Sequence, residues 1–351
     1  MAVRLQIGTK YVLGKDHPTF VIAEIGQNHQ GDVNIAKKLI KTAKDCGADC
    51  VKFQKTCLDE KFNKAALNRP YNSEHSWGAT YGDHKKYLEL SDEDFRELQA
   101  FAYEMDILFT ASAMDSNSLQ FLKSLKVPFI KIGSGDSNNF ILIKEAAATN
   151  IPLIISTGMQ DLKGVRKMYE TVAEFHKKFA LLHCVSAYPT PLADVNLNVI
   201  NLYKEEFPDI VVGYSGHELG IDVTLAAVAL GAKVIERHIT LDKHQKGSDH
   251  KCSLEPKEFE TLVKKIRDLE VALGKPVKVF QNSEISCLEK LGKSIVAAKQ
   301  LNKGDVLKLD ALKIKVAEPK GLDASLIGSI IGKRVIVDIA EDASINKNYI
   351  E

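Results

Sequence analysis

Two histidines close apolar segments in the second half of the chain, and their spacing suits metal ligands. His217 lies in YSGHELG and His238 lies in VIERHITLD, each at the end of a run that is typical of a buried strand. Ser215 and His217 are two residues apart, as are Glu236 and His238, so each pair shares one face of its strand. Two convergent imidazoles with a carboxylate nearby predict a divalent-metal site. The alternative is two core histidines that are satisfied by hydrogen bonds.

Two lysines interrupt apolar strands and predict an anion site. Lys52 in VKFQ and Lys131 in FIKIGSG lie near the carboxyl ends of their strands, where a buried, unpaired ammonium is costly. They are expected to bind an anion, or one of them forms a Schiff base. The alternative is that both ammonium groups reach solvent at the ends of their strands as ordinary surface charges. The segment GSGDSNN follows Lys131, and its backbone N–H groups with Ser134 suit a phosphate. Ser156 and Ser215 end nearby strands and are expected to join it.

Carboxylates accompany both groups. Glu24 closes the first apolar strand and is expected to transfer a proton or to pair with a lysine. Asp249 follows the eighth strand, as an outer metal ligand or as the cap of a loop. Three further histidines are interpreted as structural or surface residues: His29, His183 and His244.

These residues need a scaffold that brings strand ends together. A short hairpin is expected at residues 4–14, and then strand and helix patterns alternate eight times. The strands are short apolar runs, typical of parallel strands that are buried on both faces. Eight such units predict a (β/α)8 TIM barrel, with a doubly wound sheet as the alternative. The expected strands are 20–26, 49–54, 107–112, 128–134, 152–157, 179–185, 210–216 and 232–239.

Two other segments stand out. The connection at residues 56–91 is long for a compact barrel and holds the single tryptophan, Trp77, so we expect a lid or a binding loop. Its Ser91 is the expected N-cap of the helix that follows. The domain prediction is a barrel with its hairpin at 1–274, a polar linker at 275–292 and a small β-rich domain at 293–351.

The composition excludes several classes of protein. Lys plus Arg (47) nearly equals Asp plus Glu (46), so a strongly basic nucleic-acid surface is not expected. No apolar run approaches the roughly 20 residues of a membrane span, and the first residues lack the apolar core of a signal peptide. The six cysteines have neither disulfide nor metal-ligand spacing. We therefore expect a cytoplasmic protein with reduced cysteines.

Several motifs in order resemble one known family. AEIGQNHQGD, CVKFQK, FIKIGSGDSNN, IISTGM, HCVSAYPTP, GYSGHE and ERHITLDK are similar to the sialic acid synthase family, and the match covers essentially the whole chain. The segment NRPYNSEHSWGATYGDHKKYLELS and the tail LGKSIVAA…EPKG resemble the animal-type enzymes. The resemblance implies that the small domain is an antifreeze-like (SAF, β-clip) domain.

The resemblance also implies a reaction and a partner. It implies condensation of phosphoenolpyruvate with N-acetylmannosamine 6-phosphate, or with the free sugar, to a nine-carbon sialic acid with release of phosphate. It implies a domain-exchanged homodimer and a Mn²⁺ or Mg²⁺ ion on His217 and His238. Phosphoenolpyruvate would bind Lys52, Lys131, Ser134, Ser156 and Ser215, and the sugar and metal surroundings would be shaped by Glu24, Gln54, Asp136, Tyr188 and Asp249.

Two positions depart from bacterial members of that family. Val316 stands near an expected arginine, for which Lys320 is the candidate substitute, and Ser186 replaces an asparagine. The extra phosphate of a 6-phosphosugar needs further cations, for which the candidates are Lys61, Lys64, Arg69, Lys85 and Lys320. For proton transfer, Glu236 and Asp249 compete with Glu24.

Three alternatives stay open from sequence. One is a Schiff-base aldolase on the same barrel, and another is a phosphoenolpyruvate-dependent enzyme for a different aldose phosphate. The third is a carbohydrate- or ice-binding protein with an inactive barrel.

Overall fold

The computed structural model describes residues 3–9, 11–14 and 16–351. The chain divides into two compact units, Met1–Gly274 and Lys275–Glu351. Within the described part of the chain, no helix has both the length and the apolar character needed to cross a membrane.

The first unit is a closed barrel of parallel strands, so the predicted TIM barrel is confirmed and the doubly wound sheet is excluded. Neighbouring strands follow the order β10-β3-β4-β5-β6-β7-β8-β9, which closes the sheet between the first and last barrel strands. Each strand is apolar because helices cover its outer face and other strands face its inner side. The strands are β3 Phe20–Gly26, β4 Cys50–Lys55, β5 Leu108–Ala113, β6 Ile130–Ile132, β7 Leu153–Ser156, β8 Phe179–Cys184, β9 Val211–Gly216 and β10 Val234–His238.

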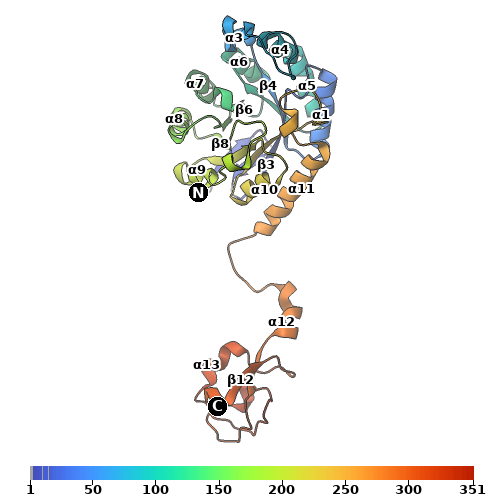
Figure 1. The fold of residues 1–351 in the computed structure, drawn as a ribbon. Helices are drawn as coiled ribbons and strands as arrows, with labels where there is room; N and C mark the ends of the chain where they lie inside the picture. The colour runs from blue at the N-terminus through green and yellow to red at the C-terminus, as the bar shows by residue number, and fades with distance from the viewer. Residues whose placement is uncertain (1–2, 10, 15) are drawn as a thin grey trace. The chain divides into compact units, whose positions relative to one another are not determined.

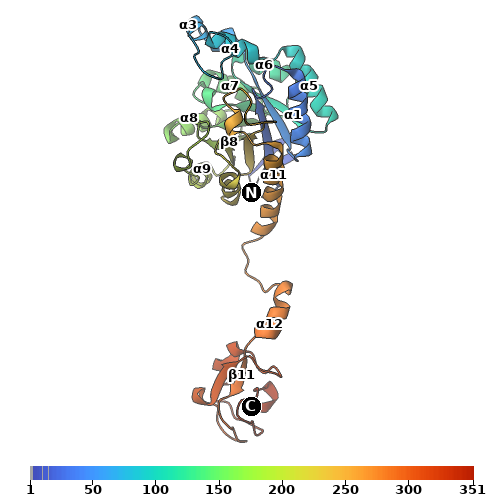
Figure 2. The same ribbon diagram turned by 45° about the vertical axis from the view of Figure 1, so that its right-hand side comes forward.

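Amphipathic helices surround the barrel (Figures 1 and 2). Ser91 caps α5 as predicted, and Asp94 completes a capping box that the sequence alone did not establish. The larger helices are α1 Val33–Asp45, α5 Asp92–Glu104, α6 Ser116–Ser124, α7 Phe140–Ala148, α8 Leu162–Ala173, α9 Val199–Glu206, α10 Asp222–Ala229 and α11 Pro256–Leu273. Single 3-10 turns follow several strands: η1 Ser134–Asp136, η2 Leu192–Asp194 and η3 His250–Cys252.

An N-terminal hairpin fills the amino-terminal end of the barrel. Strands β1 Arg4–Ile7 and β2 Tyr11–Gly14 pair antiparallel, as expected for residues 4–14. Their side chains Leu5, Ile7 and Leu13 belong to one apolar cluster with Phe20 and Phe129 of the barrel interior. Because this end of the barrel is packed with apolar groups, polar side chains inside the barrel gather at the carboxyl end.

The long second connection folds at that carboxyl end. It carries the short helices α2 Leu58–Lys61, α3 Lys64–Asn68 and α4 Tyr81–Leu88, of which α3 and α4 are labelled at one end of the barrel in both views (Figures 1 and 2). Trp77 stacks on Tyr87, with ring centroids 5.3 Å apart, and the Lys246 ammonium lies 4.9 Å from the Trp77 ring centroid. The loops that follow the second and the eighth barrel strands therefore contact each other.

The second unit has little regular structure. Strands β11 Ser294–Ala297 and β12 Leu312–Lys315 pair antiparallel, and isolated bridges and 3-10 turns join the rest: η5 Leu309–Ala311, η6 Ala324–Leu326 and η7 Lys347–Tyr349, with helix α13 Ile327–Ile330. Its own apolar core is built around Ile295, Leu307 and Ile345. The stretch expected as a linker is not featureless, because it holds η4 Asn282–Glu284 and α12 Ile285–Leu291.

Candidate active site

The two histidines meet as strand parity predicts. Strands β9 and β10 are parallel neighbours, with Ser215 paired to Glu236, and His217 and His238 follow at their carboxyl ends. The two imidazole centroids are 5.3 Å apart, and both residues are buried. The Val185 carbonyl lies 3.0 Å from Nδ1 of His217, which orients that ring and directs its other nitrogen elsewhere. Nδ1 of His238 is buried without a hydrogen-bond partner in the described part of the chain, and a carboxylate oxygen of Asp249 lies 4.0 Å from it.

Two lysines and two carboxylates form the floor of the site. The Lys52 ammonium lies 2.7 Å from Glu24 and 3.7 Å from Glu236. The Lys131 ammonium lies 3.8 Å from Glu236 and donates a 2.7 Å hydrogen bond to Ser156. All four charged side chains are almost fully buried, so their interactions are weakly screened by water.

This environment drives the two carboxyl pKa values apart. Burial raises the pKa of Glu24 to about 7, although nearby Lys52 opposes the rise. Burial also favours a raised pKa for Glu236, but Lys131 and Lys52 outweigh it and hold that pKa below its usual value. Neighbouring carboxyls with opposite shifts are suited to different roles, one exchanging a proton and the other staying charged.

The lysine pKa values also diverge. Burial alone would lower the pKa of Lys52, but Glu236 and Glu24 outweigh burial and raise it. For Lys131, burial dominates and lowers the pKa in spite of Glu236. Both directions are expected, because the Lys52 ammonium lies between two carboxylates whereas the Lys131 ammonium lies beside only one.

A cavity of about 410 Å³ at the carboxyl end joins these groups. All the predicted site residues of the barrel line this cavity. Besides the two lysines, Glu24, Glu236 and the two histidines, the predicted residues that line it are Gln54, Ser134, Asp136, Ser156, Ser186, Tyr188, Ser215 and Asp249. Gln54 donates a 2.9 Å hydrogen bond to Glu24, and Ser215 donates a 3.1 Å hydrogen bond to Glu236. The Tyr188 ring centroid lies 4.1 Å from that of His217. The Ser186 hydroxyl is buried without a hydrogen-bond partner among the described residues.

Lys320 belongs to the second unit, apart from this set. It is exposed, and its ammonium donates to the Gly292 carbonyl at 2.7 Å. Val316 is likewise exposed in that unit. The expectation that Lys320 replaces an arginine in substrate binding stays a prediction.

The structure adds lining residues that the sequence did not single out. Ser112 accepts a 3.1 Å hydrogen bond from Lys52, and it ends a strand just as Ser156 and Ser215 do, so its position was a usable signal. Cys184 also lines the cavity and accepts a hydrogen bond from Ser134 at 3.4 Å. No sequence signal identifies the other additions, which come from the connections that follow the strands: Gln27, Tyr81, Met114, Met159 and Ser248.

One glycine beside the cavity is required by close packing. A Cβ on Gly158 would lie 2.2 Å from the Ser186 hydroxyl and 2.7 Å from that of Ser134. The Gly158 N–H donates to Ser134 at 3.0 Å. By contrast, a Cβ on Gly135 would meet no atom within 4 Å, so the protein itself does not require the glycine in the GSGD turn.

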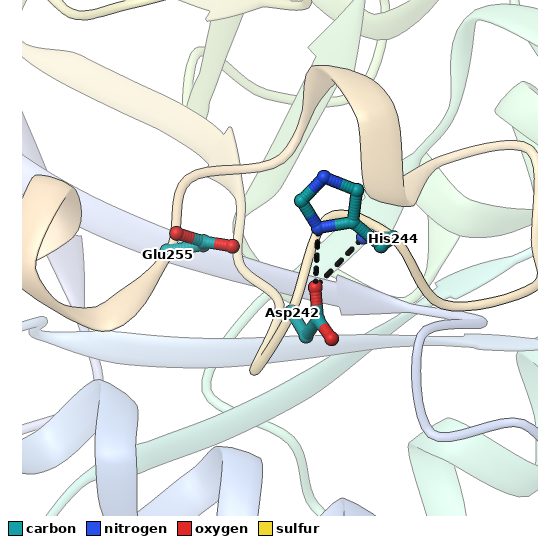
Figure 3. A group of neighbouring side chains, drawn as sticks. All are labelled: Asp242, His244 and Glu255. Carbon is teal, nitrogen blue, oxygen red and sulfur yellow. Dashed lines mark hydrogen bonds and ion pairs between the residues drawn. The ribbon is translucent and has the colours of Figure 1, made fainter.

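A separate group of possible metal ligands lies on the surface (Figure 3). Asp242, His244 and Glu255 approach one another, and Asp242 accepts hydrogen bonds from the backbone N–H of His244 at 2.8 Å and lies 3.0 Å from its Nδ1. The His244 side chain is 92% exposed, and Glu255 accepts from the Lys243 N–H at 3.1 Å. These contacts are the local hydrogen bonds of a surface loop. They agree with the interpretation of His244 as a surface residue.

Comparison with known proteins follows the division of the chain. The NeuB family model matches residues 39–278, and the SAF domain model matches residues 292–351. The chain is 51% identical to the N-acetylneuraminate-9-phosphate synthase of Homo sapiens over 100% of this chain and 98% of that one. It is 50% identical to the enzyme of the same name from Drosophila melanogaster, covering 94% and 95% of the two chains.

A solved structure agrees with these sequence matches. The crystal structure of an N-acetylneuraminic acid (sialic acid) synthetase from Leptospira borgpetersenii, in complex with citrate, superposes with a TM-score of 0.71 at 33% identity, over 82% of this chain and 96% of that one. The resemblance to sialic acid synthases is thereby confirmed, and the chain belongs to the NeuB family.

Proposed function

We propose that the protein condenses phosphoenolpyruvate with N-acetylmannosamine 6-phosphate to give N-acetylneuraminate 9-phosphate and phosphate. It is then a transferase that forms a carbon–carbon bond. The observation that carries this proposal is a single cavity that unites two buried lysines, two carboxylates and two imidazoles at the carboxyl ends of barrel strands. The names of the 50–51% identical relatives support the choice of sugar over that of another aldose phosphate.

The floor lysines bind the anionic substrate. Phosphoenolpyruvate carries a phosphate and a carboxylate, and Lys52 and Lys131 supply two ammonium groups beside the hydroxyls of Ser112 and Ser156. A buried cation is worth more to a bound phosphate than an exposed one, because little water competes for it. As phosphate departs, the same lysines stabilise the charge that develops on it.

The donor set suits a divalent cation. His217 and His238 would hold Mn²⁺ or Mg²⁺, and the buried, unpartnered Nδ1 of His238 is consistent with a ligand position. Asp249 is placed to contribute from the eighth loop. A metal with only two imidazole ligands keeps open positions, and its chemistry there is to polarise the sugar aldehyde.

The remaining chemistry needs proton transfers at the attacking water and at the sugar oxygen. C3 of phosphoenolpyruvate attacks the aldehyde carbon, whose C=O π bond breaks to leave an alkoxide, and positive charge develops on C2. Water adds to C2 and loses a proton, the alkoxide takes one up, and the bond from C2 to the phosphate oxygen breaks as the C2 hydroxyl passes its proton to the departing phosphate. Glu24 is the proposed base that takes the proton of this water, because its pKa of about 7 lets it exchange protons at neutral pH. Glu236 stays ionised between the two lysines.

Assembly and location extend the proposal. We place the enzyme in the cytoplasm as a homodimer with exchanged domains. Sedimentation of the full chain at micromolar concentration measures the dimer, and a monomer with full activity would contradict it.

One assay tests the function itself. Phosphate release from phosphoenolpyruvate is measured with N-acetylmannosamine 6-phosphate and with free N-acetylmannosamine, each with and without a chelator. The expected result is release that depends on both the sugar and the metal, together with a product whose mass equals that of the nine-carbon acid. Release without sugar, or no release with either sugar, would overturn the proposal.

A further inference from the structure

The cavity has a second pair of lysines, at its mouth. Lys61 at the end of α2 and Lys85 in the middle of α4 both line it, together with the floor lysines Lys52 and Lys131. Other cations of the same loop do not line the cavity: Lys64, Arg69 and Lys86 are exposed. The fold of the loop therefore places two of its five lysine and arginine side chains at the cavity.

Lys85 has a neutral partner. Its ammonium donates a 2.9 Å hydrogen bond to the side-chain carbonyl of Gln27, and no ion pair within 4 Å involves it in the part of the chain that the structure describes. An ammonium carries three N–H donors, so two remain for a bound group. Burial lowers the pKa of Lys85, with the charge of Lys61 adding to that effect and Asp249 opposing it. A partly buried cation with no close carboxylate is stabilised when an anion arrives.

Lys61 completes the pair from the other side of the loop. Its ammonium lies 3.1 Å from Asp136, which follows β6. Both lysines line the same cavity, and the charge of Lys61 contributes to lowering the pKa of Lys85. A doubly charged anion bound by both ammonium groups would offset this unfavourable interaction. Lys61 therefore has a carboxylate partner, as Lys52 has Glu24 at 2.7 Å and Lys131 has Glu236 at 3.8 Å. Among the four lysines of the cavity, Lys85 alone has no carboxylate within 4 Å in the described part of the chain.

Helix α4, which carries Lys85, is held in position before any ligand binds, and the Lys61 ammonium is held by Asp136. The Thr80 hydroxyl accepts the Asp83 N–H and the Asp83 carboxylate accepts the Thr80 N–H, and this capping box fixes the start of α4. Trp77 stacks against Tyr87 of the same helix and lies under the ammonium of Lys246. A preorganised pair of cations loses less side-chain entropy on binding than two mobile surface lysines.

We propose that Lys61 and Lys85 form the binding site for the phosphate group of a phosphorylated sugar, separate from the floor lysines that take phosphoenolpyruvate. This rests on the proposed condensation and assigns the residues that select the phosphorylated over the free sugar. The cavity then has one lysine pair for each of the two phosphates that enter it.

The test compares Lys85→Gln with wild type on both sugars. For N-acetylmannosamine 6-phosphate, kcat/KM is expected to fall roughly 10- to 100-fold, the value of one charged hydrogen bond. For free N-acetylmannosamine and for the KM of phosphoenolpyruvate, the change is expected to stay within about threefold, since neither contact is lost. Lys85→Arg is expected to recover most of the loss, and the matched control Lys86→Gln, one residue away but exposed, should leave both sugars unchanged.

Direct binding separates this inference from the proposed function. Calorimetry of N-acetylmannosamine 6-phosphate with the full chain is expected to show affinity reduced by a similar factor in Lys85→Gln and further in Lys61→Gln/Lys85→Gln. If wild type condenses both sugars with equal kcat/KM, or if Lys85→Gln weakens both equally, the phosphate site is overturned and the condensation stands. If wild type releases no phosphate with either sugar, the condensation fails. The calorimetric difference between the two sugars then still decides whether the lysine pair binds phosphate.

Discussion

Arg237 and Glu218 form an ion pair 2.8 Å long with neither side chain exposed, next in sequence to the two histidines that line the cavity. Arg237 precedes His238 and Glu218 follows His217, and the imidazoles line the cavity whereas this pair does not. Arg237 also donates to Thr224 at 2.7 Å and to the Glu218 carbonyl at 2.7 Å. A buried network of hydrogen bonds thus joins the ends of two strands that carry the site, although Nε of Arg237 has no partner among the described residues.

Breaking this network should cost much of the barrel's stability. In Arg237→Met the free energy of unfolding is expected to fall by about 3–5 kcal/mol, because a buried carboxylate loses its cation. Urea denaturation followed by circular dichroism measures it. The control is Arg166→Met, which breaks an ion pair of 2.9 Å to Glu206 at the surface and should cost less than about 1 kcal/mol. Equal losses in the two variants would show that burial of the pair is not what matters.

Replacing Glu24 should reduce turnover much more than it weakens substrate binding. In Glu24→Gln, kcat is expected to fall roughly 10²- to 10⁴-fold, the usual contribution of a positioned base. The amide keeps the shape and an acceptor for Gln54 but takes no proton, so the KM of phosphoenolpyruvate should change little. Steady-state kinetics with both substrates varied measures the split. A raised KM with unchanged kcat would assign Glu24 to binding instead.

Much of the floor of the site was predictable because strand parity is strict. A side chain two residues from another on a strand faces the same way, so Glu236 follows from His238 and Lys131 from its place in a buried strand. Ser112 was missed although it lies near the carboxyl end of β5, as Ser156 lies at the carboxyl end of β7. Its place at a strand end was the usable signal, because the serine forms no further pattern with its apolar neighbours.

The mouth of the site was not predictable in the same way. None of the candidate cations of the loop could be preferred as a cavity residue, because a loop lacks the regular period that tells which side chains share a face. These candidates are Lys61, Lys64, Arg69 and Lys85. What separates them is the fold of α2 and α4, which depends on stacking among aromatic rings far apart in the loop, such as Trp77 with Tyr87. Such contacts carry no short-range sequence signal.

Acid should destabilise the barrel through His29. This histidine is buried, and burial lowers its pKa to about 4, below the ordinary 6.5 of an unfolded chain. Above pH 6.5 neither state binds the proton, so the group has no effect there. Between about pH 6.5 and 4 only the unfolded chain is protonated, and the free energy of unfolding is expected to fall by up to about 1.4 kcal/mol per pH unit from this group.

The variant His29→Asn isolates that contribution. Asparagine can still accept the Gly31 N–H that His29 Nδ1 accepts at 3.0 Å, but it does not titrate. Urea midpoints between pH 4 and 7.5 should therefore show a shallower slope than in wild type, whatever the change at pH 7.5. The exposed His244, as His244→Asn, is the control. Identical slopes of urea midpoint against pH in His29→Asn and wild type would show that His29 does not contribute to the acid destabilisation.

Replacing a single histidine in each candidate metal group decides between them. His238→Ala is expected to lose both turnover and Mn²⁺ binding, because it removes one of two imidazoles at the strand ends, while phosphoenolpyruvate still binds to Lys52 and Lys131. His244→Ala removes a ligand of the exposed group and should retain both. Mn²⁺ binding to each full-length variant is measured by equilibrium dialysis, and phosphoenolpyruvate binding by calorimetry. If His244→Ala lost the ion and His238→Ala kept it, the metal would belong to the surface group. Full activity of metal-stripped wild type would remove the metal from the reaction altogether.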